Sequence, residues 1–419
     1  MREMKESGVE WIGEIPKEWH ITQTRRLFRN EKNIVGDAAD EYERLALTLK
    51  GVIKRSKNDS EGLQPEKFEG YQILRQNELV FKMIDLENVN TSRVGLSPYT
   101  GLVSPAYIVL KNDSDDNRYD YYWFMSMYYN EVFNHLGGDG VRSALNVKDM
   151  LSLPIPNISK IQKKMLADYL DAKCSKIDEI IEKQQVIIEK LKEYKLHLIQ
   201  ETVTKGLDRN AELRESGEIW IGKVPKHWDV LKLKSHTRMI TPMRDKPEDL
   251  GGDIPWIRIE DYNGKYIDSS REGFGVSEQT AKEMNLKVYP VGSVLCTSSC
   301  DLGKCAIVAT PLVSNQRFIN IVPDEDTSSD YLYYVMLSNA DRMNHLSTGT
   351  IQANLSRVAF EHLLIQFPPL EEQKEIARYL DHKVEVIDST IMGKEKLVEK
   401  LREYKKSLIY EVVTGKKEV

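Results

Sequence analysis

The sequence predicts an α+β protein in which two mixed α/β modules are separated by two long antiparallel coiled-coil helices, as a pseudo-two-fold internal repeat. Three observations lead to this fold class. The two halves of the chain begin and end with matching strings, two long stretches carry a coiled-coil pattern, and the interiors alternate short β-rich runs with helical stretches.

The chain is an internal repeat. Residues 7–21 (SGVEWIGEIPKEWHI) align with residues 216–230 (SGEIWIGKVPKHWDV) at eight identical positions of fifteen, and residues 190–204 align with 400–414 at ten of fifteen. The interiors at 31–135 and 240–345 share no long identical stretch. Matching ends with unlike interiors favour two related modules that serve different ligands. The alternative is a duplication whose interiors drifted without purpose.

Each half ends in a predicted long helix. The first follows Ser159, a good N-cap residue, runs from Lys160 to about Thr204 without proline or glycine, and ends near Gly206. The second follows Pro368 and ends near Gly415. A helix of about 45 residues is roughly 68 Å long. Spacings of three and four predict a coiled-coil seam. Its members are Ile177, Ile180, Ile187, Leu191, Tyr194 and Leu198, then Ile387, Leu397, Leu401, Tyr404 and Leu408.

The predicted domains are residues 1–158 and 207–368 (the first and second module) and the helices at 159–206 and 369–419. Strands are expected at 79–84, 106–110, 294–297, 306–309 and 318–322, and helical stretches at about 119–135 and 330–345. If the termini of each module lie close together, the second helix must return beside the first. The C-terminal tail then lies near Ser7.

Composition limits the function. The net charge of −6 argues against a generally basic nucleic-acid binder, so any DNA contact must rest on local positive charge. The start MREMKESG has no apolar stretch, and no run approaches a membrane span, so a cytoplasmic protein is expected. No phosphate loop, dinucleotide fingerprint or zinc-protease motif is present, which favours binding over catalysis. Ordinary core residues are expected at Cys174, Cys296, Cys300 and Cys305.

Several strings resemble a known family. The pattern W-I-G-x-[IV]-P-x-x-W in each half resembles the opening of target-recognition domains in type I restriction–modification specificity subunits. The strings GLVSPAYIVL (101–110) and VYPVGSVLCTSSCDLGKCAIVAT (288–310) resemble strand segments of those domains, although cysteines replace commoner polar or aromatic residues. IQKKMLADYLD (161–171) and EEQKEIARYLD (371–381) resemble the family's helical regions. The likeness covers essentially the whole chain.

The resemblance implies a non-catalytic subunit of an adenine-specific methyltransferase and restriction complex. Each module would read one half of a bipartite, asymmetric site in double-stranded DNA. The helices would set the spacing and dock two modification subunits, which bind S-adenosylmethionine. Restriction subunits would bring ATP and magnesium, so no cofactor or metal is expected in this chain. A coiled-coil interaction scaffold without a nucleic-acid role is the alternative.

Positive and amide side chains of the modules are the candidates for DNA contact, because arginine or lysine suits guanine and asparagine or glutamine suits adenine. An ordinary solvated charge is the alternative for each. In the first module the candidates are Lys54, Arg55, Lys57 and Asn58, in an expected polar loop. In the second they are Arg258, Lys265, Arg271, Lys304, Asn315, Gln316 and Arg317. The paired tryptophans at 11, 19, 220 and 228 are expected to be packing anchors.

Overall fold

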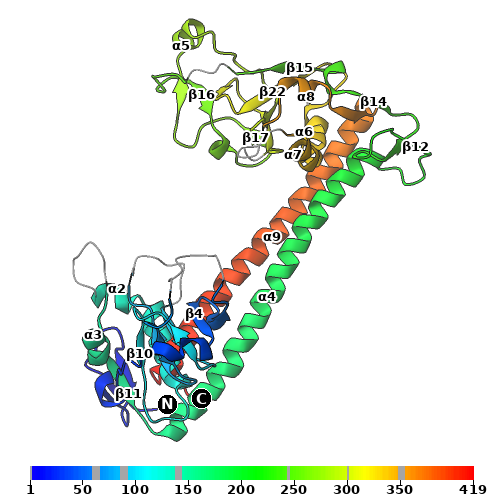
Figure 1. Ribbon diagram of the computed structural model, residues 1–419. Helices are drawn as coiled ribbons and strands as arrows, with labels where there is room; N and C mark the ends of the chain where they lie inside the picture. The colour runs from blue at the N-terminus through cyan, green and yellow to red at the C-terminus, as the bar shows by residue number, and fades with distance from the viewer. Residues whose placement is uncertain are drawn as a thin grey trace. The chain divides into compact units, whose positions relative to one another are not determined.

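The computed structural model describes residues 2–58, 67–84, 93–136, 144–242, 246–299, 302–347 and 354–419. The chain forms two compact units. The first comprises Met1–Gln185 with Lys396–Val419, and the second comprises Val186–Glu395. Each unit contains one module together with part of α4 (Lys160–Lys205) and part of α9 (Leu370–Val413) (Figure 1). None of the helices in the described ranges is long and apolar enough to cross a membrane.

The first unit combines a small base with two interior sheets. At the base, β1 (Met4–Glu6) pairs with β2 (Glu14–Pro16), and β3 (His20–Gln23) pairs with β11 (Pro154–Asn157). One interior sheet has the order β5-β4-β9-β6, formed by Gly51–Arg55, Arg44–Thr48, Gly101–Val103 and Gln72–Leu74. The other is β10-β7-β8, formed by Ile108–Leu110, Leu79–Phe81 and Val94–Leu96. Besides the long helices, the first unit contains α1 (Arg118–Tyr129), α2 (Val132–Leu136) and α3 (Val147–Ser152).

The second unit repeats this base around a larger interior. β12 (Leu213–Glu215) pairs with β13 (Lys223–Pro225), and β14 (Asp229–Lys232) pairs with β23 (Leu364–Phe367). The main sheet has the order β15-β22-β19-β20-β17, formed by Thr237–Ile240, Phe318–Pro323, Val294–Thr297, Cys305–Val308 and Tyr266–Ile267. A smaller sheet is β18-β16-β21, formed by Gly275–Val276, Ile254–Ile257 and Val313–Ser314. The helices are α5 (Glu278–Glu283), α6 (Ser329–Ser338), α7 (Ala340–Leu346) and α8 (Arg357–Glu361).

The α+β class and the internal repeat are therefore confirmed. The two hairpins at the base, the strand pairs β3–β11 and β14–β23, and the three-stranded sequences β10-β7-β8 and β22-β19-β20 correspond between the units. The five predicted β-rich runs all contain strands, because consecutive apolar residues in them are buried on both faces of a sheet. The units differ in the strands added around this shared part, where the sequence halves also differ.

Tryptophans anchor the base of each unit, as predicted for three of the four. Trp19 and Trp228 are each 1% exposed, and the Trp228 indole donates a hydrogen bond to Glu372 on α9 over 3.0 Å. Trp11 packs against Trp123 with ring centroids 5.3 Å apart. Trp220 is the exception, since it is 41% exposed. The repeated motif thus serves mainly to pack each module onto the long helices.

Glycines end both long helices in the left-handed region. Gly206 has φ +74° and Gly415 has φ +72°. A Cβ on Gly206 would lie 3.0 Å from the Trp228 ring, and one on Gly415 would lie 2.4 Å from Pro16. Both the backbone angle and the close approach therefore require glycine at these positions. The predicted helix ends are confirmed.

The two long helices run antiparallel within each unit. In the second unit Ile188 on α4 packs with Ile387 and Ile391, while Ile199, further along α4, shares a core with Ile376 at the start of α9. In this unit Lys195 Nζ lies 2.6 Å from Asp388. The first unit has the equivalent ion pair, in which Lys405 Nζ lies 2.6 Å from Asp178.

The predicted coiled-coil seam is half right. Buried positions include Ile177, Ile181, Val398 and Leu408 in the first unit and Ile188, Ile387 and Ile391 in the second, while Leu191, Leu198 and Leu401 are partly buried. The remaining predicted members are wrong, because the residue after each of them faces the partner helix instead. These five, Ile180, Ile187, Tyr194, Leu397 and Tyr404, are 37–54% exposed. Two heptad registers fit these helices and have every second seam position in common. At several of the other positions apolar residues are adjacent, such as those at 180 and 181, so either could face the partner helix. The spacing of apolar residues alone therefore did not distinguish the two registers.

The C-terminal tail lies against the base of the first module, as the topology argument expected. The Tyr410 hydroxyl donates hydrogen bonds to the backbone oxygens of Trp11 and Ile12, over 3.1 and 3.0 Å. The backbone N–H of Arg2 donates to Glu418 over 3.1 Å. The last turns of α9, including Val412 and Val413, belong to the core of this unit.

Candidate nucleic-acid interface

The candidates of the first module lie on a strand and its following turn. The expected loop at 54–58 is wrong for Lys54 and Arg55, which end β5 and pair with Leu45 and Arg44 on β4. The buried Val52 holds this strand in the sheet. Lys54 Nζ lies 2.5 Å from Glu43, and this ion pair, with its hydrogen bond, raises the pKa of the lysine.

The turn after β5 contains the other two candidates. Lys57 Nζ donates to the backbone oxygen of Ala39 over 2.7 Å and lies 3.5 Å from Asp40. Asn58 is exposed at the end of the described segment. The lysine is thus held against its own module, while the Asn58 side chain faces solvent.

The two arginine candidates at 258 and 271 in the second module contact other residues of that module. Arg258 Nη2 lies 2.9 Å from Glu272, which raises the pKa of the guanidinium, and the group stacks 4.7 Å from the centre of the Phe274 ring. Arg271 Nη2 donates to the Tyr262 backbone oxygen over 3.1 Å. These contacts orient both guanidinium groups on the module.

Lys265 joins the second module to α9. Its ammonium lies 2.6 Å from both Asp330 and Asp381, and its side chain is 15% exposed. Burial opposes the positive charge, but the hydrogen bonds to the two carboxylates raise the pKa of the lysine overall. The structure therefore gives Lys265 a packing role, with little of its surface available to a ligand.

The remaining candidates gather at one end of the five-stranded sheet. The backbone of β19 continues past Thr297, whose N–H donates to the oxygen of Lys304, and the next N–H, of Ser298, donates to the oxygen of Arg317. Lys304 and Arg317 thus flank the end of this strand, and both are exposed. Asn315 turns back to accept the backbone N–H of Arg317 over 3.0 Å. Gln316 is exposed beside them.

A hollow of about 370 Å³, lined by both polar and apolar side chains, opens at this end of the sheet. Its lining includes Thr241, Ser298, Gln316, Asn354 and Arg357. The side chains offer amides and a guanidinium, the groups that read adenine and guanine edges or hold phosphates. These groups match the chemistry expected of a surface that contacts DNA, and the Arg357 guanidinium also pairs with Glu361 over 2.7 Å.

Sequence reasoning missed Asn354 and Arg357. They lie about forty residues after Gln316 and belong to no local motif. Backbone pairing brings them into place, because the N–H of Leu355 donates to the oxygen of Ser298 and a bridge joins Asn354 to Ser299. Only the folded sheet could reveal this neighbourhood.

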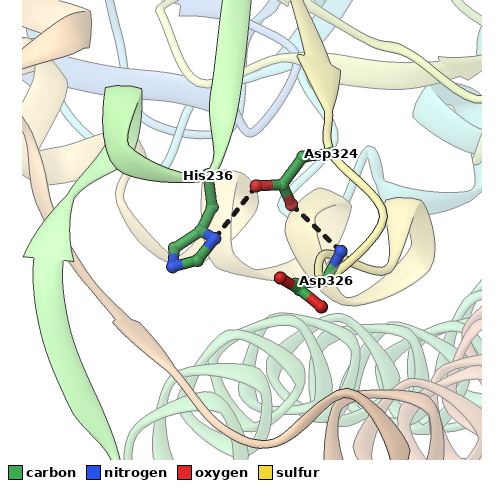
Figure 2. A group of neighbouring side chains, drawn as sticks. All are labelled: His236, Asp324 and Asp326. Atoms are coloured by element: carbon green, nitrogen blue, oxygen red, sulfur yellow. Dashed lines mark hydrogen bonds and ion pairs between the residues drawn. The ribbon is translucent and has the colours of Figure 1, made fainter.

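One group of possible metal ligands occurs in the described part of the chain, at His236, Asp324 and Asp326 (Figure 2). The Nδ1 of His236 lies 3.0 Å from one oxygen of Asp324. The other oxygen accepts the backbone N–H of Asp326 and the hydroxyl of Thr327, over 3.1 and 3.0 Å. The Asp324 N–H donates to the His236 backbone oxygen. These contacts link the residue before β15 to the turn that follows β22, which gives the group a structural role.

Three of the cysteines lie in the cores as predicted. Cys174, Cys296 and Cys305 are buried, and Cys300 lies outside the described residues. Burial raises the pKa of Cys174 to about 11, and burial likewise raises the pKa of Cys305 well above its ordinary value. Both therefore stay protonated at neutral pH, as small apolar side chains do.

The helices also present exposed apolar side chains. In the first unit these include Ile180, Leu397 and Tyr404, and in the second Val186, Ile187, Tyr194, Leu196 and Met392, with exposed fractions of 37–66%. Exposed apolar side chains are typical of protein contacts where they gather on a surface.

Comparison with known proteins agrees with this arrangement. A chain from the solved structure "Structural basis underlying complex assembly and conformational transition of the type I R-M system" matches with a TM-score of 0.72 and 12% identity, covering 95% of this chain and 98% of that one. The HsdS subunit from Thermoanaerobacter tengcongensis matches with a TM-score of 0.50 and 12% identity, covering 96% and 98%. The fold is therefore that of type I specificity subunits.

Sequence matches take the assignment further. Residues 225–400 match the family model of the type I restriction modification DNA specificity domain. The MjaIX specificity subunit of Methanocaldococcus jannaschii is 36% identical over 181 residues, less than half of each chain (42% of both). The putative MjaX specificity subunit of the same organism is 21% identical over 97% of this chain and 95% of its own length. The chain is therefore similar in sequence and in fold to type I restriction–modification specificity subunits, and the scaffold alternative is not favoured.

Proposed function

We propose that each module reads one half of a bipartite, asymmetric sequence in double-stranded DNA on behalf of a type I complex. The observation that carries this proposal is a shared base with unlike interiors. The strand pairs and hairpins at the base and one three-stranded part of the interior correspond between the units, whereas the strands added around them differ. Two related readers with different surfaces should recognise two different half-sites.

The long helices are proposed to set the half-site spacing and to dock two modification subunits. Their exposed apolar residues support docking because such side chains gain free energy when a partner removes them from water. Tyr194 and Tyr404 are repeat equivalents, 54% and 51% exposed. Equivalent surfaces on the two units favour two copies of one partner.

The chemistry is proposed to belong to the partners. The modification subunits would bind S-adenosylmethionine and methylate adenine, and restriction subunits would use ATP and magnesium to translocate and cut DNA. This chain would itself be non-catalytic and act in the cytoplasm. Its net charge of −6 predicts weak DNA affinity without partners, because sequence-independent affinity comes mainly from phosphate contacts by basic side chains.

The deciding experiment is co-expression with a cognate modification subunit in a methylation-deficient host, followed by mapping of methylated adenines. One split motif methylated on both strands is expected. Replacing residues 31–135 by the same segment of another family member should change one half of the motif, and replacing 240–345 should change the other. A change in both halves, or in neither, from either exchange would show that the modules do not read independently.

A further inference from the structure

A pair of tyrosines recurs on equivalent helices of the two modules. Tyr119 and Tyr122 lie on α1, and Tyr331 and Tyr334 lie on α6, in each case three residues apart. At this spacing both side chains project from one face of the helix. In each unit that face meets both long helices.

The first tyrosine of each pair reaches the end of one long helix. The Tyr119 hydroxyl donates 2.7 Å to the backbone oxygen of Val413, at the end of α9. The Tyr331 hydroxyl donates to the backbone oxygen of Val203, near the end of α4, and shares this contact with the oxygen of Gln366, each over 3.2 Å. Val203 and Val413 are repeat equivalents. The last carbonyls of a helix have no partner within it, so these oxygens are available to a buried hydroxyl.

The second tyrosine reaches an aspartate near the start of the other long helix. The Tyr122 hydroxyl donates 2.8 Å to Asp171 on α4, and the Tyr334 hydroxyl donates 2.6 Å to Asp381 on α9. Asp171 and Asp381 close the repeated strings IQKKMLADYLD and EEQKEIARYLD.

Each of these aspartates also pairs with a cation of its module. Arg118 Nη1 lies 2.5 Å from Asp171, and Lys265 Nζ lies 2.6 Å from Asp381. The two cations come from different elements. Arg118 is the first residue of α1, whereas Lys265 directly precedes β17. The tyrosine contact is therefore retained between the units, while the accompanying cation has a different origin.

We propose that Tyr119, Tyr122, Tyr331 and Tyr334 are positioning residues that fix the orientation of each module on the helix pair and so set how strictly the complex measures the DNA spacer. Apolar packing alone is non-directional and lets a module rotate slightly. Hydrogen bonds to one carbonyl and one carboxylate, on two antiparallel helices, remove that freedom. The inference rests on the proposed function, because it concerns how the two half-sites are held at one spacing.

The test compares methylation rates of the complex with its modification subunits on DNA carrying the native spacer and spacers one base pair longer or shorter. Tyr122→Phe with Tyr334→Phe removes two hydroxyls and keeps the rings. The expected result is roughly a tenfold loss of discrimination between spacers, the change in equilibrium that follows loss of a hydrogen bond to a charged group. Recognition of the bases within each half-site should not change.

The adjacent residues provide a matched control. Tyr121 and Tyr333 are the neighbours of Tyr122 and Tyr334, and their hydroxyls make no hydrogen bond with any described residue. Tyr121→Phe with Tyr333→Phe should leave spacer discrimination as in the wild type. Melting temperature, measured on all variants, separates loosened positioning from a general loss of stability.

Three outcomes decide the inference. Unchanged discrimination in the Tyr122→Phe, Tyr334→Phe variant would overturn it and leave the proposed function standing. Equal loss in the control variant would also overturn it, because the hydroxyl contacts would not be the cause. If the wild-type complex methylates no split site, the proposed function is wrong and the positioning role is wrong with it. Should the first variant not fold, Tyr119→Phe with Tyr331→Phe must show the same loosened discrimination.

Discussion

Two neighbouring isoleucines on α4 distinguish the observed coiled-coil register from the one that spacing predicts. Ile188 is 6% exposed and packs with Ile387 and Ile391, whereas Ile187 is 37% exposed. Replacing Ile188 by alanine removes buried methyl and methylene groups and leaves a cavity between the helices. For a site this closely packed we expect a loss of about 2–4 kcal/mol in the free energy of unfolding.

The same replacement at Ile187 should cost less than about 1 kcal/mol. Its side chain already contacts water, so less apolar area returns to solvent on unfolding. Alanine also has the higher helix propensity, which offsets part of the loss by a few tenths of a kcal/mol. The two variants therefore differ in expected cost although they change the same residue type one position apart.

Urea unfolding followed by circular dichroism at 222 nm measures both costs, because the long helices contribute much of that signal. The denaturation midpoint of Ile188→Ala should fall clearly below that of Ile187→Ala. If Ile187→Ala were the more destabilising change, the register in the structure would be wrong. The exposed Ile187 should instead matter for capture of the modification subunits, measured by co-purification.

Three further predictions concern the end of α4, the partly buried Lys265 and the hollow at the end of the five-stranded sheet. Gly206→Ala should lower the melting temperature through a cost of about 1–2 kcal/mol, since φ is +74° and the Trp228 ring is close. The raised pKa of Lys265 means that its charge stabilises the fold fully below about pH 10.5, and that this contribution is lost as pH rises through the folded-state pKa. Lys265→Met should therefore flatten the alkaline decline in melting temperature. Gln316→Ala with Asn354→Ala should alter one half of the methylated motif only, as sequencing of methylated DNA would show.

Sequence periodicity located the long helices because their signal extends over more than forty residues and is repeated. Both helix starts follow good caps or prolines, and both ends are glycines that the backbone requires. Five of the six strands in the shared three-stranded part were also predicted, because short runs of apolar residues bounded by turn residues favour strands, whereas β8 (Val94–Leu96) was not.

Features that depend on contact between distant segments were not predictable. The heptad pattern admits two registers where apolar residues are adjacent, and only burial decides between them. Lys54 and Arg55 belong to a strand because β4 supplies its partner, although their local sequence is polar. A backbone bridge to Ser299 brings Asn354 into the same hollow as Gln316. The Tyr122–Asp171 pair joins residues 49 positions apart, and neither residue type reveals its partner.

The order in which the two units can finish folding during synthesis follows from the fact that the end of α9 belongs to the first unit. The second unit is one continuous segment, Val186–Glu395, whereas the first needs Lys396–Val419 as well as the residues made before it. Leu408, Val412 and Val413 fill its core. A chain leaving the ribosome can therefore complete the later unit first, while the earlier one keeps apolar surface uncovered until Lys396–Val419 have been made. Termination of synthesis after Glu395 would spare the second unit and leave the first with an open core.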